Sequence, residues 1–67
     1  MTQIIFNGVK KEIREKCSIS KLLEQLQVDR KEVAVERNLK VVQKSDFDTT
    51  YLENGDQVEV VRFVGGG

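Results

Sequence analysis

The chain has 67 residues, with 11 basic and 11 acidic side chains, no histidine and one cysteine. This length allows a single small domain, and a net charge of zero argues against nucleic acid as the main partner. One cysteine without histidine excludes an internal disulfide and a zinc site built from those ligands. Because no segment resembles a membrane-spanning helix or a signal peptide, we expect a cytoplasmic protein without a membrane partner.

The first third of the chain predicts a hairpin. Residues 3–7 have the pattern of a strand, with Ile4 and Phe6 on one face. Asn7-Gly8 is a strong hairpin signal, because both residues tolerate the positive φ of a type I′ turn. The returning strand, residues 9–17, mixes charged with apolar side chains. We therefore expect it to be short or to lie at a sheet edge.

A helix is predicted to begin after Ser18, whose hydroxyl can accept a hydrogen bond from the first free backbone N–H groups. The apolar residues that follow have the i, i+3, i+4, i+7 spacing of one helical stripe: Ile19, Leu22, Leu23 and Leu26. Such a stripe must be buried, and the preceding hairpin offers a surface for it. Val28 is expected to fold back onto the same core.

Two shorter strands are predicted next. The first covers residues 33–36 and the second returns at residues 41–42. The turn between them, residues 37–40, contains Asn38, which tolerates a left-handed conformation. Residues 45–52 are polar and irregular, with three expected anchors into the core: Phe47, Tyr51 and Leu52.

The last strand, residues 57–64, follows a second strong turn signal, Glu-Asn-Gly-Asp. Val58 and Val60 share one of its faces, and Val61 and Phe63 share the other. If the first pair faces the helix, the second pair lies on the open face of the sheet. Exposed apolar side chains there suggest a docking surface, although neighbouring side chains could equally cover them.

This element order is that of an α+β fold of the ubiquitin-like β-grasp type. In it, one main helix packs across one face of a mixed sheet of four to five strands, with the first and last strands parallel at the centre. We expect the β-grasp domain to span residues 1–64 and a flexible C-terminal glycine tail to span residues 65–67. Three glycines contribute no side chains to a core, and ordering them costs more conformational entropy than ordering other residues would. Their extended length of roughly 10 Å would carry a carboxylate into a narrow site, although a frayed end is the alternative.

Charge is unevenly distributed along the chain. Residues 1–44 have a balance of +4, and residues 45–67 have a balance of −4. Ordinary solvated charge explains this distribution, but so does steering of the tail-bearing end toward a basic partner surface.

Catalysis by this chain itself has little support. There is no histidine, and acidic pairs such as Asp46 and Asp48 fall in polar, turn-like stretches with nothing nearby to form a pocket. Cys17 is expected to be a small buried hydrophobe, because Lys16 beside it would point to the opposite face of a strand and would not stabilise a thiolate.

Several motifs occur in a defined order along nearly the whole chain. They are Ile-Ile-Phe-Asn-Gly at residues 4–8, the Leu22-Leu23 pair with Leu26, Val-Ala-Val-Glu at 33–36 followed by Asn38, Leu-Glu-Asn-Gly-Asp at 52–56, and the ending Val-Val-Arg-Phe-Val-Gly-Gly-Gly at 60–67. In this order they resemble the ThiS family, the small sulfur carriers of bacterial thiamine biosynthesis. Two positions depart from the family pattern: Leu39 stands where the family often has Gly, and Lys11 replaces a commonly apolar strand residue.

The resemblance implies a protein co-substrate that is not an enzyme and holds no permanent cofactor or metal. An E1-like adenylyltransferase (ThiF-like) would consume ATP to adenylate the carboxylate of Gly67, and a sulfur donor such as a cysteine desulfurase would lead to a thiocarboxylate. A thiazole synthase (ThiG-like) would then accept the sulfur. Gly66 would complete the family's Gly-Gly motif. The residues expected to contact partners are Val61, Phe63, Val64 and Gly65.

Two other interpretations stay open at this point. The chain could carry sulfur for another pathway, as the small subunit of molybdopterin synthase does with the same fold and tail, although that subunit is usually longer. It could also be a ubiquitin-like interaction module whose glycine tail is inert.

Overall fold

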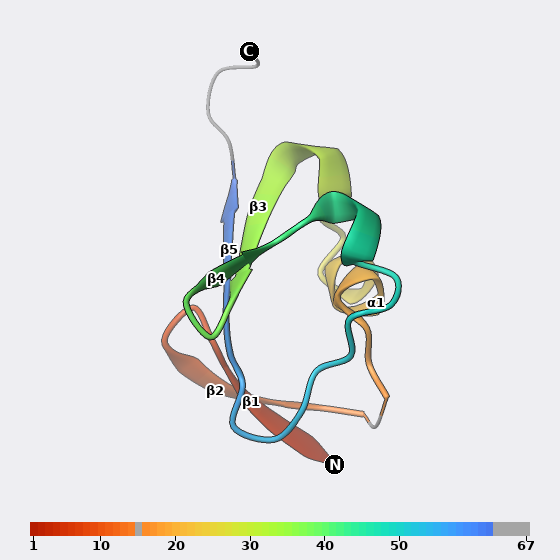
Figure 1. The fold of residues 1–67 in the computed structure, drawn as a ribbon. Helices are drawn as coiled ribbons and strands as arrows, with labels where there is room; N and C mark the ends of the chain where they lie inside the picture. Colours follow the sequence, from red (N-terminus) through yellow and green to blue (C-terminus); the bar gives the residue numbers. More distant parts are fainter. Residues whose placement is uncertain (15, 63–67) are drawn as a thin grey trace.

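The computed structural model describes residues 1–14 and 16–62, and the tail residues 65–67 therefore lie outside the described part of the chain. The elements follow in this order: β1 (Thr2–Phe6), β2 (Val9–Ile13), α1 (Ile19–Gln25), the 3₁₀-helix η1 (Arg30–Glu32), β3 (Val33–Arg37), β4 (Lys40–Val42), the 3₁₀-helix η2 (Lys44–Asp46) and β5 (Gln57–Arg62). Figure 1 shows the sheet on one side and α1 with the 3₁₀-helices on the other. No described helix is long and apolar enough to cross a membrane.

The five strands form one mixed sheet in the order β2-β1-β5-β3-β4. β5 is the middle strand and runs parallel to β1, whereas its other neighbour, β3, is antiparallel (Figure 1). The β1–β2 and β3–β4 pairs are antiparallel hairpins. This sheet, with one helix on one face, confirms the β-grasp arrangement that the element order predicts.

The β1–β2 hairpin turns as expected, with φ of 47° at Asn7 and 83° at Gly8. β2 lies at the edge of the sheet, also as expected. The strand is shorter than predicted, however, because it ends at Ile13 and does not reach Cys17. Lys16 has a φ of 55°, a left-handed conformation that no regular strand contains, so the chain leaves the sheet before it reaches α1.

The helix begins as predicted. The Ser18 hydroxyl accepts a hydrogen bond from the backbone N–H of Lys21 at 3.1 Å, which caps the N-terminus of α1. Ile19 and Leu22 are fully buried, and Val28 folds back against the same core. The predicted apolar stripe therefore faces the sheet.

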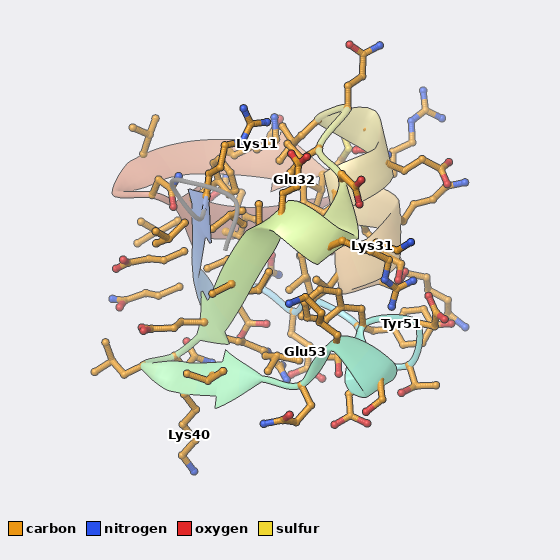
Figure 2. The ribbon with its side chains drawn as sticks, turned by 90° about the horizontal axis from the view of Figure 1, so that it is seen from above. Lys11, Lys31, Glu32, Lys40, Tyr51 and Glu53 are labelled. Carbon is orange, nitrogen blue, oxygen red and sulfur yellow. The ribbon has the colours of Figure 1, made fainter. Side chains whose placement is uncertain are left out.

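The core joins the helix, the sheet and the segment between β4 and β5. Its buried members are Ile4, Ile13, Cys17, Ile19, Leu22, Leu23, Val33, Val35, Phe47, Leu52 and Val58. Phe47 and Leu52 are the anchors that the sequence predicts, but the prediction for Tyr51 is wrong, because its side chain is 52% exposed (Figure 2). Successive side chains on extended backbone point in opposite directions, so the burial of Leu52 turns Tyr51 outward.

Both later turns use left-handed residues. Asn38 has a φ of 52°, as expected, and Leu39 beside it has a φ of 71°. The turn before β5 has Gly55 at a φ of 86°. Leu39, at the position where the family often has glycine, therefore adopts a left-handed conformation that a residue with a side chain tolerates poorly.

Candidate functional site

The end of β5 is the candidate site, because it leads into the glycine tail. The predicted site residues Phe63, Val64, Gly65, Gly66 and Gly67 lie outside the described residues, so the described part of the site ends at Arg62. Figure 1 shows β5 in blue, directed toward one end of the molecule from the middle of the sheet. β5 has β1 on one side and β3 on the other, but its pairing with β1 ends at Val58 whereas its pairing with β3 continues to Arg62.

The two faces of β5 have the predicted orientation. Val58 is fully buried and Val60 is partly buried against the core, whereas Val61 is 57% exposed. Val61 lies opposite Ala34 of β3, on the open face of the sheet. Figure 2 shows a row of side chains that project from the sheet on the side away from α1. The exposure of Val61 fits a docking surface, and its contact with a partner stays a prediction.

Two carboxylates lie beside Val61 on the open face. Glu59 of β5 is directly opposite Glu36 of β3 in the strand register. No ion pair joins either of them to a basic side chain within residues 1–14 and 16–62. Like charges directly opposite each other on neighbouring strands are destabilising. A basic partner group that approached this pair would relieve the repulsion.

The acidity of the C-terminal third is partly neutralised by the basic first part of the chain. Asp48 pairs with Arg30 at 3.2 Å, and Asp56 pairs with Arg37 at 2.8 Å. A hydrogen bond from the Ser20 hydroxyl and the nearby Arg30 guanidinium lower the pKa of Asp48. The acidic surface beside Val61 therefore comes from Glu59 together with Glu36, which belongs to the basic part of the sequence.

Asp56 fixes the start of β5. Its carboxylate accepts hydrogen bonds from Arg37 Nε at 2.8 Å, from Asn38 Nδ2 at 3.1 Å and from the Glu53 backbone N–H at 2.8 Å. Burial alone would raise the pKa of this carboxyl, but the hydrogen bonds and the charge of Arg37 outweigh burial and lower the pKa. The sequence predicts only a turn here, and the buried carboxylate was missed.

Asn7 holds the opposite end of β5. Its backbone N–H donates to the carbonyl oxygen of Val58 at 2.9 Å. Its side-chain Oδ1 accepts from the Val60 N–H at 2.9 Å, and Nδ2 donates to the Val60 carbonyl oxygen at 3.4 Å. The side-chain amide thus continues the β1 ladder one step toward the tail. The Asn-Gly pattern predicts the turn but carries no signal for this contact.

A shallow apolar hollow of about 270 Å³ lies beside the end of β5. Its lining comes from the ends of β1, α1 and β5 and from the start of β3: Phe6, Asn7, Leu26, Val28, Val33, Val60 and Arg62. Figure 2, which looks down on this end of the molecule, shows Lys31 and Glu32 on η1 between β3 and α1. An accessible apolar surface therefore lies beside the end of β5, the strand that precedes the tail in the sequence.

Cys17 takes no part in this site. Its side chain is 3% exposed, and its thiol donates a hydrogen bond to the Ser18 carbonyl oxygen at 3.4 Å. Burial raises the pKa of the thiol, although the charge of Lys21 opposes the rise. These observations confirm the prediction of a buried hydrophobe. Among residues 1–14 and 16–62, no three acidic or cysteine side chains are grouped so that they could hold a metal ion.

A mixed five-stranded sheet with one helix on one face, and the last strand in its centre, defines a small β-grasp protein of the ubiquitin-like type. A model of the ThiS family matches residues 4–67 of the chain. The match covers almost the whole sequence, and the chain belongs to the ThiS family.

Individual relatives agree with this assignment. The sulfur carrier protein ThiS of Bacillus subtilis is 40% identical over 50 residues, which cover 75% of this chain and 76% of that protein. The crystal structure of a thiamine biosynthesis protein (ThiS) from Geobacter metallireducens superposes with a TM-score of 0.84 at 33% identity, over 98% of this chain and 100% of that one. A thiazole synthase of Paramagnetospirillum magneticum is 38% identical over 65 residues, but the chain spans only 20% of that protein's length.

Proposed function

We propose that this chain is a cytoplasmic sulfur carrier for thiamine biosynthesis, and that the carboxylate of Gly67 carries the sulfur as a thiocarboxylate. Membership of the ThiS family, with a match that extends through the terminal glycines, is the observation that carries this proposal. The fold supports it, because β5 occupies the middle of the sheet and leads directly to the tail.

The chemistry needs an activated carboxyl group. In the proposed sequence, an oxygen of the Gly67 carboxylate attacks the α-phosphorus of ATP and expels pyrophosphate, which leaves an acyl-adenylate. The terminal sulfur of a donor persulfide then attacks the acyl carbon and displaces AMP, which gives an acyl disulfide. A second thiol attacks the donor's sulfur in this disulfide, so the thiocarboxylate is released and the donor and the second thiol are left joined as a disulfide. Glycine suits this position because the absence of a β-carbon lets the backbone approach the nucleotide closely. Gly66 serves the same purpose, and Gly65 lengthens the arm.

The proposed partners are an E1-like adenylyltransferase, a sulfur donor such as a cysteine desulfurase, and a thiazole synthase as acceptor. The relative from P. magneticum supports the last of these. That protein is called a thiazole synthase, and a segment similar to this chain forms about a fifth of it. A carrier and its acceptor joined in one polypeptide would hand over sulfur without dissociating. ATP is consumed by the activating enzyme, and the carrier holds no cofactor of its own.

The open face of the sheet is the proposed docking surface for these partners. Val61 supplies exposed apolar area, and the facing carboxylates of Glu36 and Glu59 favour a basic partner group. Phe63, Val64 and Gly65 are proposed to continue this contact into the partner's channel. The complementary surface would combine apolar side chains with an arginine or a lysine.

The decisive experiment is a reconstitution followed by mass spectrometry of the intact chain. Incubation with the adenylating enzyme, ATP and a sulfur donor should give a product heavier by the exchange of one oxygen for sulfur. Deletion of Gly66 and Gly67 should abolish the product and leave the thermal melting temperature unchanged. Cys17→Ser is the matched control, because it removes the chain's only thiol and should leave product formation intact. If the carboxylate stays unmodified in the wild-type reaction, the proposed sulfur-carrier function is refuted.

A further inference from the structure

One edge of β5 loses its neighbour before the strand ends. The register of β1 with β5 ends at the Phe6–Val58 pair, and the hairpin then turns back at Gly8. The Asn7 side chain occupies the next step, where it bonds both backbone groups of Val60. Backbone groups two residues apart point to the same edge of a strand, so the N–H and C=O of Arg62 face the side that β1 has left.

This edge has no recorded partner at Arg62. Within residues 1–14 and 16–62, no backbone or side-chain hydrogen bond is recorded from the β1 hairpin to Arg62. The opposite edge of β5, in contrast, pairs with β3 as far as the Val33–Arg62 position. A notch one strand wide therefore lies beside β5 at Arg62, the last described residue of the strand.

The apolar hollow opens beside this notch. Arg62, at the unpaired step of β5, and Val60, at the step paired with Asn7, both line the hollow, together with Val28 from the segment after α1. A strand placed in the notch would direct every second side chain toward the hollow. The side chain of Arg62 is exposed, and no ion pair joins it to an acidic residue in the described chain.

We propose that the activating enzyme adds an extended segment of its own to this edge of β5, with its backbone paired to Arg62. One aliphatic side chain of the segment fills the hollow, and a carboxylate of the segment pairs with the guanidinium of Arg62. The inference rests on the proposed function, because it takes the adenylating enzyme as the partner. Strand addition gains affinity from backbone hydrogen bonds and selectivity from pockets for alternate side chains.

Three features of this end of β5 favour an extended segment as the partner over a purely apolar partner surface. The free edge can accept a backbone partner, the hollow can accept an apolar side chain, and the exposed guanidinium of Arg62 can pair with a negative charge. The edge is also continuous with the tail that the enzyme must hold. Pairing that begins at Arg62 would keep the tail extended and guide the terminal carboxylate toward ATP.

Amide hydrogen exchange of the labelled carrier, free and saturated with the activating enzyme and ATP, tests the proposal. The Arg62 amide should exchange at least about tenfold more slowly in the complex. If the added strand continues along an extended tail, the alternation of backbone groups predicts protection at Val64 and little gain at Phe63. Uniform protection of all three amides would indicate enclosure in a channel and would overturn strand addition. An unchanged rate at Arg62 would also overturn it.

Substitutions at the hollow give an independent test. Val28→Lys places a charge in the hollow and Val28→Phe fills it, and each should weaken binding to the activating enzyme about tenfold in titration calorimetry. Val28→Phe keeps the site apolar, so the proposal can still be tested with this variant if the lysine variant fails to fold. Leu39→Lys is the control, since Leu39 is 79% exposed in the turn beside the start of β5, and it should bind like wild type. Wild-type affinity in both Val28 variants would refute the proposal.

The outcome also separates this inference from the proposed function. If the wild-type carrier forms an adenylate but shows no protection at Arg62, only strand addition fails. If no adenylate forms under any condition, the carrier function fails and the strand addition fails with it.

Discussion

The two ends of β5 are held in different ways. At its start, the chain is fixed by a buried carboxylate, Asp56, with donors from three other residues. At its end, Asn7 supplies the last contact that the structure records from the β1 side. The start of the strand thus carries a dense polar network, and the end beside the tail carries an open edge and a hollow.

This difference indicates how a small domain can present a reactive tail. A chain of 67 residues has a thin margin of stability and cannot leave much of its core open. The fixed start holds β5 in register, so the opposite end can expose backbone and apolar surface without loss of the fold. The contacts that stabilise the fold and the surface that is open to a partner therefore lie at opposite ends of β5.

Among the substitutions predicted here, removal of the Asp56 carboxylate at the start of β5 should cause the largest loss of stability. Asp56→Asn puts an NH₂ group at one of the two oxygen positions, where it faces either the Asn38 donor at Oδ1 or the Arg37 and Glu53 donors at Oδ2. We expect the free energy of unfolding to fall by about 3 kcal/mol, because buried donors and the guanidinium lose their partner. Calorimetry should show a melting temperature lower by roughly 15 °C.

The matched control for this substitution is Asp46→Asn, which removes an exposed carboxylate in η2. It should change the melting temperature by only a few degrees, as surface substitutions do. Equal losses in the two variants would show that the Asp56 network is not what fixes the start of β5.

The pH dependence of stability should report the same network. The folded pKa of Asp56 is lowered, so between that value and the unfolded value of about 3.9 the unfolded chain binds more protons. The stabilisation by Asp56 is therefore present above about pH 4 and is lost as the pH falls toward the folded pKa. Melting curves between pH 6 and pH 2.5 should fall more steeply for wild type than for Asp56→Asn. Parallel curves would contradict the assignment.

At the other end of β5, where Asn7 contacts Val60, we expect a smaller and more local loss of stability. Asn7→Gly keeps the positive φ but removes both side-chain hydrogen bonds to Val60. We expect a loss of about 1 kcal/mol in the free energy of unfolding, together with faster amide exchange at Val60. Asn38→Gly is the counterpart at the other end, where Asn38 Oδ1 accepts from the Gln57 N–H at 2.9 Å, and it should speed exchange at Gln57 instead. If both variants speed exchange along all of β5, the two ends are not independent.

Local patterns in the sequence predict much of this fold. The stripe after Ser18, the Asn7-Gly8 turn and the alternation in the last strand each depend on neighbours in sequence, and the structure confirms all three. These patterns also give the order of the elements, and the family resemblance adds the role proposed for the tail. The open face was predicted from alternation alone, which correctly placed Val61 outside the core.

The features that local patterns did not predict are contacts between distant residues. Asn7 and Val60 are 53 positions apart, and Arg37 and Asp56 are 19 apart. Each of these polar side chains looks like an ordinary turn or surface residue until the sheet brings the strands together. Tyr51 shows the opposite error, because an aromatic side chain beside a buried neighbour was expected in the core and is exposed. The notch at Arg62 was missed for the same reason, since it depends on where another strand ends.

The smallest change in stability should come from a substitution of Leu39, in the turn beside the start of β5. A left-handed φ costs a residue with a side chain about 1–2 kcal/mol, and Leu39 is 79% exposed, so it regains little by burial. Leu39→Gly should therefore raise the free energy of unfolding, by about 0.5 kcal/mol after the added flexibility of the unfolded chain is subtracted.

Urea denaturation would show this gain as a higher midpoint with an unchanged slope. Val41→Gly is the control, because Val41 is also exposed but lies within β4, where glycine should destabilise. A lower midpoint for Leu39→Gly would mean that the leucine makes a stabilising contact. A higher midpoint would mean that Leu39 is strained in the folded protein, in a turn whose neighbouring residue, Asn38, is held by its hydrogen bond to Asp56.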